Sequence, residues 1–132
     1  MSEKPTLPPH DVDAETAVLG SILLDAADCL PQIRRVLAPT HFYRLIHATI
    51  YQAVLNCWDH RNGAVDNVLV GDELRRMGKL DEIGGSPYLT TLILGVPTCL
   101  HGVHYARIVK EFAIRRRMLS EAGRIAARAY NE

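Results

Sequence analysis

Two short segments of the sequence hold thiol and imidazole groups at spacings that could bind a metal ion. Cys57 and His60 are three positions apart, and Cys99 is followed by His101 and His104. Thiolate and imidazole groups are the usual ligands of structural zinc, but the paired Cys-x-x-Cys spacing typical of such sites is absent. We therefore favour ordinary packing of the cysteines with solvated histidines, and we expect no metal and no cofactor.

A second pair of histidines, His41 and His47, flanks two aromatic residues and could suggest acid–base chemistry. Nothing completes a catalytic site, because no serine or cysteine nucleophile has an identifiable partner. The nearby acidic residues are spaced like exposed helix and turn positions: Asp72, Glu73, Asp81 and Glu82. The sequence also lacks the phosphate-binding pattern Gly-x-x-x-x-Gly-Lys-Ser/Thr. We assign no catalytic residue, expect the chain itself not to be an enzyme, and expect these histidines to be buried or to cap a helix.

The only dense basic feature combines the run at residues 115–117 with Arg124 and Arg128. It could bind a phosphate backbone or an acidic protein surface. Three consecutive residues point in three directions around a helix, and Arg115 falls on its apolar side. We favour a solvated face with interface ion pairs over direct contact with DNA.

The composition is that of one ordinary globular domain, with 132 residues of which 48% are hydrophobic and 23% charged. Fifteen basic and fifteen acidic residues give a formal net charge of zero, so general electrostatic binding to nucleic acid or to an anionic membrane is not expected. The odd number of cysteines favours reduced thiols, and no apolar run suits a signal peptide or a membrane span. A cytoplasmic location is the simplest expectation.

The long C-terminal helix expected over residues 103–130 positions most of the candidate contact residues. One apolar stripe on it comprises Tyr105, Ile108, Val109, Phe112, Leu119, Ala126 and Tyr130. A second stripe holds Ile114, Met118 and Ile125, bridged to the first by Ala122 and Ala129. A helix with two apolar stripes needs two packing partners.

Five shorter helices are expected before it, after a proline-rich flexible arm at residues 1–10. The first begins near Asp11 and ends at about Leu24. Asp28 is predicted to cap the second, with Pro31 in its first turn and Pro39 after its end.

The third helix is predicted to end at the Asn62-Gly63 pair, which adopts left-handed backbone more readily than other residues do. Its inward side chains are expected to be Ile46, Ile50, Tyr51, Val54, Leu55 and Trp58. Asp66 should cap the fourth helix and Gly78 end it, while Ser86 opens the fifth. No convincing strand pattern occurs, so the expected fold class is all-α: a helical bundle over residues 11–100 followed by a long helix over residues 101–132.

Several blocks resemble the N-terminal domain of DnaB-type replicative DNA helicases, in the same order along the chain. Residues 8–25 (PPHDVDAETAVLGSILLD) resemble the opening of that domain, and Phe42-Tyr43-Arg44, His47, Ile50-Tyr51, Val65-Asp66 and residues 72–80 (DELRRMGKL) resemble its middle. Residues 83–89 (IGGSPYL), 96–98 (VPT) and 105–109 (YARIV) resemble its end. The likeness covers about residues 8–130.

The resemblance implies a compact helical bundle followed by a helical hairpin. In the family, the hairpins pair subunits into dimers, and the dimers form an N-terminal collar on a hexameric helicase. The resemblance also implies contact with primase. The first apolar stripe would then meet the chain's own bundle, and the second would meet another helix of the hairpin or a second subunit. The implied interface residues are Ile114, Arg115, Met118, Ala122, Ile125 and Ala129.

Two features depart from the family pattern. His101-Gly102 stand where the family usually has an asparagine before the long helix, which is a weaker helix start. The sequence also ends before a second hairpin helix, a linker or a motor domain, so we expect an excised domain or a shortened relative.

Two other functional interpretations stay open. One is a separate regulatory protein that mimics this domain and binds primase or a helicase; a reading frame continuing into a P-loop motor would exclude it. The other is a small DNA-binding protein, which rests on the arginine cluster alone and requires an affinity that falls steeply with salt.

Overall fold

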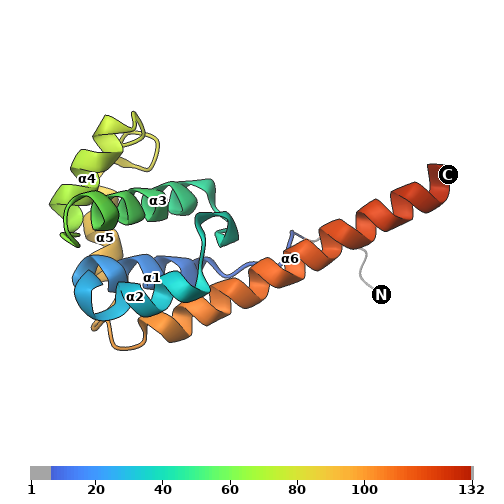
Figure 1. The fold of residues 1–132 in the computed structure, drawn as a ribbon, viewed down its shortest axis with the longest axis horizontal. Helices are drawn as coiled ribbons and strands as arrows, with labels where there is room; N and C mark the ends of the chain where they lie inside the picture. Colours follow the sequence, from blue (N-terminus) through green and yellow to red (C-terminus); the bar gives the residue numbers. More distant parts are fainter. Residues whose placement is uncertain (1–6, 132) are drawn as a thin grey trace.

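The computed structural model describes residues 7–131, and these form an all-helical fold (Figure 1). The elements are α1 (Val12–Leu24), α2 (Ala26–Val36), a 3-10 turn η1 (Pro39–His41), α3 (Leu45–His60), α4 (Asn67–Arg76), α5 (Gly85–Leu94) and α6 (Gly102–Asn131). The described part of the chain contains no strand, which confirms the predicted all-α class. Six residues of the expected flexible arm, 1–6, lie outside the described range.

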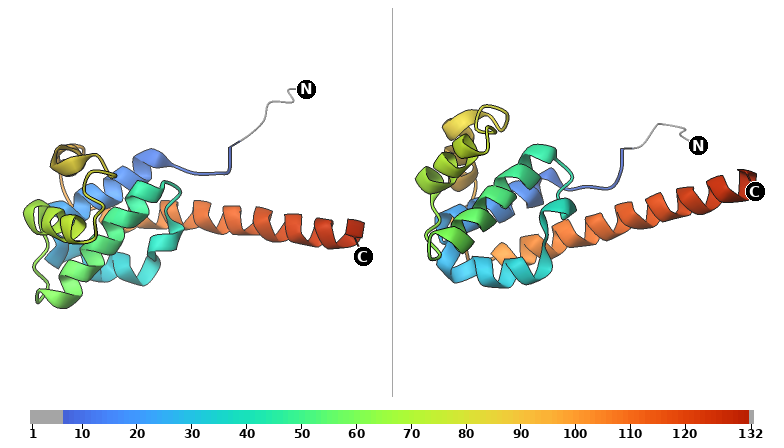
Figure 2. Two further views of the ribbon diagram at one scale, coloured as in Figure 1. Left: turned by 90° about the horizontal axis from the view of Figure 1, so that it is seen from above. Right: turned by 45° about the horizontal axis from the view of Figure 1, so that its top comes forward.

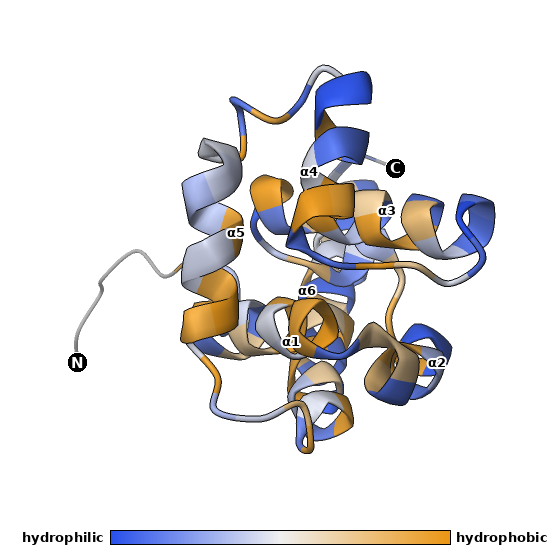
Figure 3. Ribbon diagram, turned by 90° about the vertical axis from the view of Figure 1, so that its left-hand side faces the viewer, coloured by the Kyte–Doolittle hydropathy of each residue, from blue (hydrophilic) through white to orange (hydrophobic). Residues whose placement is uncertain are grey.

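Helix α1 is the central element of the bundle, with α5 on one side and α2 on the other (Figure 3). Asp11 starts it, since its carboxylate accepts a hydrogen bond from the backbone N–H of Ala14 at 2.9 Å. Its buried apolar side chains, which pack against several neighbouring helices, are Val18, Leu19, Ile22 and Leu23. Gly20 allows α5 to approach closely, because a Cβ at this position would overlap the carbonyl oxygen of Leu92.

The predicted start of α2 was wrong by three residues. Asp25, not Asp28, caps this helix, and its carboxylate accepts from the backbone N–H of Asp28 at 3.1 Å. Pro31 consequently lies inside α2 rather than in its first turn. Asp25 follows α1 directly, so a single residue separates the two helices.

The predicted ends of α3 and α4 are confirmed. Asn62 and Gly63 have φ angles of +55° and +79°, and Gly78 has +72° after α4. Asp66 caps α4 as expected, with its carboxylate 2.8 Å from the backbone nitrogen of Leu69. The fifth helix starts earlier than Ser86, at Gly85, because Gly84 takes the cap position with φ +106°.

Helix α3 supplies much of the core, as expected. Ile50, Tyr51 and Val54 are fully buried, and the Tyr51 hydroxyl donates to the backbone oxygen of Leu37 at 2.9 Å. Burial raises the pKa of Tyr51 to about 12, so its hydroxyl stays protonated. Trp58 is partly buried and packs against the edge of this core, so its expected inward direction holds but its burial is incomplete.

Helix α6 is 30 residues long, which corresponds to about 45 Å at 1.5 Å per residue. Its first half lies against α1 and α2, while its second half extends away from the bundle as a single rod (Figures 1 and 2). Within residues 7–131, no helix is both long enough and apolar enough to cross a membrane.

Candidate protein–protein interface

The second half of α6 leaves several large apolar side chains exposed to solvent. Ile114 is 49% exposed, Met118 65%, Ile125 69% and Tyr130 91%. Leu119 is also exposed, and every described side chain from Arg117 to the end of the helix is solvent-accessible. Several large exposed apolar side chains on one helix are typical of a contact with another protein.

The face of α6 that contacts the bundle coincides with the predicted first stripe only in part, at Tyr105 and Val109. The buried residues are Gly102, Ala106 and Val109, and they are followed by half-buried Ala113. Small residues at this spacing let α6 lie close to its neighbours: a Cβ at Gly102 would come within 3.1 Å of Ile33 and 3.2 Å of Ser21.

Most of the predicted first stripe therefore does not anchor the helix. Ile108 is 38% exposed, Phe112 is half-buried, and Leu119, Ala126 and Tyr130 lie beyond the bundle. Of the residues expected to pack on the bundle, Val109 is buried and Tyr105 is partly buried against the core, whereas Leu119 lies beyond the bundle and is exposed. As a result, more apolar surface on α6 is left uncovered than the sequence predicted.

All the interface residues predicted from the resemblance lie on this exposed part of α6: Ile114, Arg115, Met118, Ala122, Ile125 and Ala129. Ile114, Met118 and Ile125 share one side of the helix by their spacing. The guanidinium of Arg115 lies over the ring of Phe112, 5.1 Å from the centroid, so this residue has a contact within its own helix.

Arg116, at the centre of the basic run, has a role that the sequence pattern did not indicate. Its Nη1 donates to the backbone oxygen of Pro9 at 2.8 Å, and its Nη2 donates to the backbone oxygen of His41 at 2.7 Å. The same guanidinium lies 5.6 Å from the ring centroid of Tyr43, which stacks on His10 at 4.0 Å. Arg116 thus connects α6 to both η1 and the segment before α1.

His41 lies beside the same contact, and its Nδ1 accepts a hydrogen bond from the backbone N–H of Ala38 at 2.9 Å. Its Nε2 lies 3.2 Å from Nζ of Lys110. Partial burial lowers the pKa of His41, and the positive charges of Lys110 and Arg116 lower it further. His41 therefore caps a turn, which was one of the two expected roles.

His47 is fully buried and forms a polar network with two residues from other helices. Its Nδ1 lies 2.7 Å from a carboxylate oxygen of Glu15, and its Nε2 lies 2.6 Å from the Tyr88 hydroxyl. Glu15 also accepts hydrogen bonds from the backbone nitrogens of Tyr43 and Arg44, at 2.6 and 3.3 Å. The network joins α1, α3 and α5 and satisfies every polar group in it, so its arrangement is that of a structural core element.

The predicted packing role of the cysteines agrees with the structure. Cys29 and Cys57 are buried, Cys99 is half-buried, and all three carry free thiols. Burial raises the pKa of Cys29 to about 12, so this thiol is poorly nucleophilic.

The structure does not bring Cys57 and His60 together with the second set, Cys99, His101 and His104. Within residues 7–131, the only group of three potential metal ligands lying within 4.8 Å of one another is Asp25, Asp28 and Cys99. Asp25 already caps α2, and Cys99 lies within hydrogen-bonding distance of Asp28.

The described residues therefore define a class of protein: an all-helical interaction module with a packed bundle and one projecting helix whose apolar side is uncovered. The family model for the DnaB-like helicase N-terminal domain matches residues 7–111. This chain belongs to that family, which confirms the resemblance found in the sequence.

The relatives that it resembles are replicative DNA helicases. It is 42% identical to the replicative DNA helicase DnaB of Geobacillus stearothermophilus and 43% identical to the replicative DNA helicase DnaC of Bacillus subtilis, in each case over 94% of this chain. The matched region covers 27% of the length of each of these proteins, so the chain spans about a quarter of the relatives.

Two solved structures have the same fold. The N-terminal domain of DnaB helicase from Mycobacterium tuberculosis matches with a TM-score of 0.90 and 41% identity, over 94% of this chain and 85% of that one. A DnaB-like replicative helicase, described together with its interactions with primase, matches with a TM-score of 0.74 and 30% identity, over 92% of this chain and 28% of that one.

Proposed function

We propose that this chain is the non-catalytic collar domain of a replicative DNA helicase, in which it joins subunits to one another and docks primase during DNA replication. The observation that carries the proposal is the uncovered apolar side of α6 beyond the bundle, at Ile114, Met118 and Ile125. In this proposal, the ATP-dependent motor belongs to another part of the parent protein, and the domain acts in the cytoplasm without contacting a membrane.

The energetics of this surface support the proposed self-association. Each fully buried aliphatic side chain contributes about 1.5–3 kcal/mol relative to its exposed state. A second copy of the helix, or the second helix of a hairpin, could cover Ile114, Met118, Leu119 and Ile125 together. Leu119 and Tyr130 join the proposed interface because neither contacts the bundle.

Primase docking is proposed by analogy with the DnaB-like helicase that was described with its primase interactions. Direct DNA contact is not part of the proposal. Arg116 is occupied by backbone oxygens of the chain itself, and Arg124 pairs with Glu121 at 2.8 Å. Two arginines of the basic feature, Arg116 and Arg124, are therefore engaged in contacts within the chain.

Sedimentation velocity tests the proposed self-association. We expect the double variant Ile114→Asp with Met118→Asp to shift the chain towards monomer without losing helix content, because two carboxylates would be buried in the interface. The matched control is Ser120→Asp with Ala127→Asp, which adds the same charge to exposed positions on the opposite side of α6. Identical sedimentation of the wild type and the first variant would refute self-association through this stripe.

A further inference from the structure

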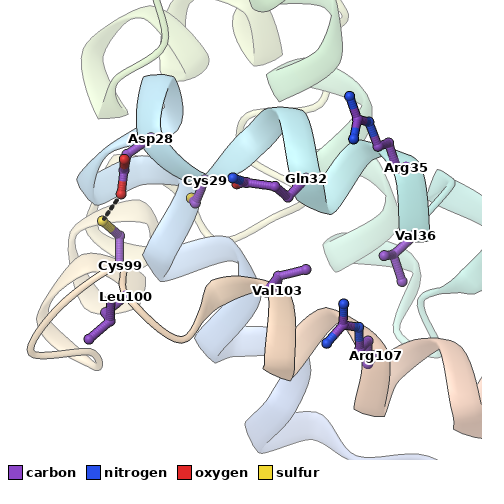
Figure 4. Close-up of a pocket in the computed structure, with 9 residues that line it drawn as sticks. All are labelled: Asp28, Cys29, Gln32, Arg35, Val36, Cys99, Leu100, Val103 and Arg107. Atoms are coloured by element: carbon purple, nitrogen blue, oxygen red, sulfur yellow. Dashed lines mark hydrogen bonds between the residues drawn. The ribbon is translucent and has the colours of Figure 1, made fainter.

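A groove of about 420 Å³ runs between α2 and the start of α6, separate from the projecting half of the long helix (Figure 4). One wall belongs to α2, and the other to the first turns of α6 and the residues just before it. The lining residues are Asp28, Cys29, Gln32, Arg35, Val36, Cys99, Leu100, Val103 and Arg107. Leu100, at the rim, is 70% exposed, so the groove offers apolar surface that is open to a partner.

The two ends of the groove carry opposite charge. Asp28 lies at one end, where its carboxylate is 3.7 Å from the sulfur of Cys99. Arg35 of α2 and Arg107 of α6 lie at the other end, on opposite walls (Figure 4). Val103 provides apolar surface in the middle of the groove, and Val36 lies at the basic end between Arg35 and Arg107 (Figure 4).

Within the described part of the chain, neither Arg35 nor Arg107 forms a hydrogen bond or an ion pair. The preceding arginine of α2 behaves differently, because Arg34 makes a two-point contact with Asp59 at 2.7 and 2.9 Å. Each of these guanidinium groups is therefore available to a carboxylate of a partner, which would accept charge-assisted hydrogen bonds from it.

The spacing along the groove corresponds to two turns of a helix. Asp28 and Arg35 are seven residues apart on α2, which is about 10.5 Å at 1.5 Å per residue. A partner helix with a carboxylate and a basic side chain seven residues apart, and an aliphatic side chain between them, would match both charged ends and the apolar middle. Such helix-in-groove contacts use side chains that share one face of the partner.

We propose that this groove is the binding site for an amphipathic helix of primase, with acidic side chains directed at Arg35 and at Arg107. The proposal rests on the proposed docking function and adds its contact surface. The groove is formed by the bundle and the first turns of α6, so primase could bind here while the projecting half of α6 contacts another subunit.

Calorimetric titration of the chain with purified primase from the same organism tests the proposal. We expect Arg35→Glu with Arg107→Glu to weaken binding about tenfold or more, and the loss to shrink at high salt. Gln32→Trp, a bulky substitution at an exposed groove position, should also weaken binding without a charge change. The matched control is Arg44→Glu with Arg117→Glu, which makes the same charge change at exposed positions outside the groove, and helix content is compared for every variant.

The outcomes separate this proposal from the docking function on which it rests. Loss of affinity in the groove variants with an unchanged control supports the groove. Wild-type binding that the groove variants leave intact, or an equal loss in the control, overturns the groove and leaves primase docking standing. A wild-type chain that does not bind primase overturns both.

Discussion

The guanidinium of Arg116 donates a 2.8 Å hydrogen bond to the backbone oxygen of Pro9, across 107 positions of the chain. A second hydrogen bond from the same group reaches the backbone oxygen of His41. This contact lies where α6 leaves the bundle. Arg116 joins the helix there to η1 and to the segment before α1, so the direction of the projecting half depends on this residue.

Arg116→Ala should reduce the free energy of unfolding by about 1.5–3 kcal/mol, because hydrogen bonds from charged groups contribute in that range and two carbonyl oxygens lose their partner. Urea denaturation followed by circular dichroism measures the change. Arg117→Ala is the matched control, since it is the next residue, is exposed, and should change stability by less than about 0.5 kcal/mol. Equal midpoints for both variants would show that the Arg116 contacts contribute nothing to stability.

Glu15→Ala should be more damaging, because the Glu15 carboxylate accepts hydrogen bonds from two backbone N–H groups and lies beside the His47 ring. Truncation leaves these buried donors without a partner, and we expect a loss of about 3–5 kcal/mol. Asp13→Ala removes an exposed carboxylate from the same helical turn and should cost far less. Tyr88→Phe removes only the outer hydrogen bond of the network and should fall between the two. Equal unfolding midpoints for Glu15→Ala and Asp13→Ala would show that the Glu15 network does not contribute to stability.

Gly20→Ala tests the close approach of α1 and α5. The added methyl group would overlap the Leu92 carbonyl oxygen, which is backbone and cannot rotate away, so the two helices must separate. We expect a loss of about 1–3 kcal/mol, as for other overpacked cores, despite the higher helix propensity of alanine. Gly123→Ala is the matched control, since a Cβ there meets nothing within 4 Å, and this substitution should leave stability equal or slightly raised. A stabilising effect of Gly20→Ala would show that this contact is loose.

The sequence predicted most of the helices because local signals coincide at their ends. Asp66 and Gly78 bound α4 in this way, each through a contact or backbone angle within a few residues. The cap of α2 was predicted three residues too late because Asp25 and Asp28 are both suitable capping residues, and only the structure shows that α2 begins one residue after α1 ends.

The contacts that define the candidate site were harder to predict because they join distant positions. Hydrophobic spacing identified Ile114 and Met118 as exposed candidates, but it could not show that α6 packs on the bundle through Gly102 and Ala106. Which face of α6 packs on the bundle depends on how closely α1 and α2 allow α6 to approach. This distance is set by the side chains of all three helices. The partial burial of Trp58 has a related cause, since helical spacing gives the direction of a side chain and not the depth of the core around it.

The stability of the chain should fall in mildly acidic solution partly through His41. Its pKa in the folded protein is lowered by partial burial and by the nearby charges of Lys110 and Arg116, whereas in the unfolded chain it takes the ordinary value near 6.5. The unfolded state therefore binds the proton more readily, so this contribution is fully present above about pH 6.5 and is lost as the pH falls towards the lower, folded-state pKa. His41→Gln, which keeps an acceptor near the Ala38 N–H, should flatten this part of the curve of unfolding free energy against pH. Urea midpoints of wild type and variant between pH 7.5 and 5 measure the difference, and parallel curves would show that His41 does not contribute.

Lys110→Met provides a second test of the His41 contribution. Removing the adjacent positive charge raises the pKa of His41 in the folded state, which should reduce the slope of unfolding free energy against pH without altering the histidine.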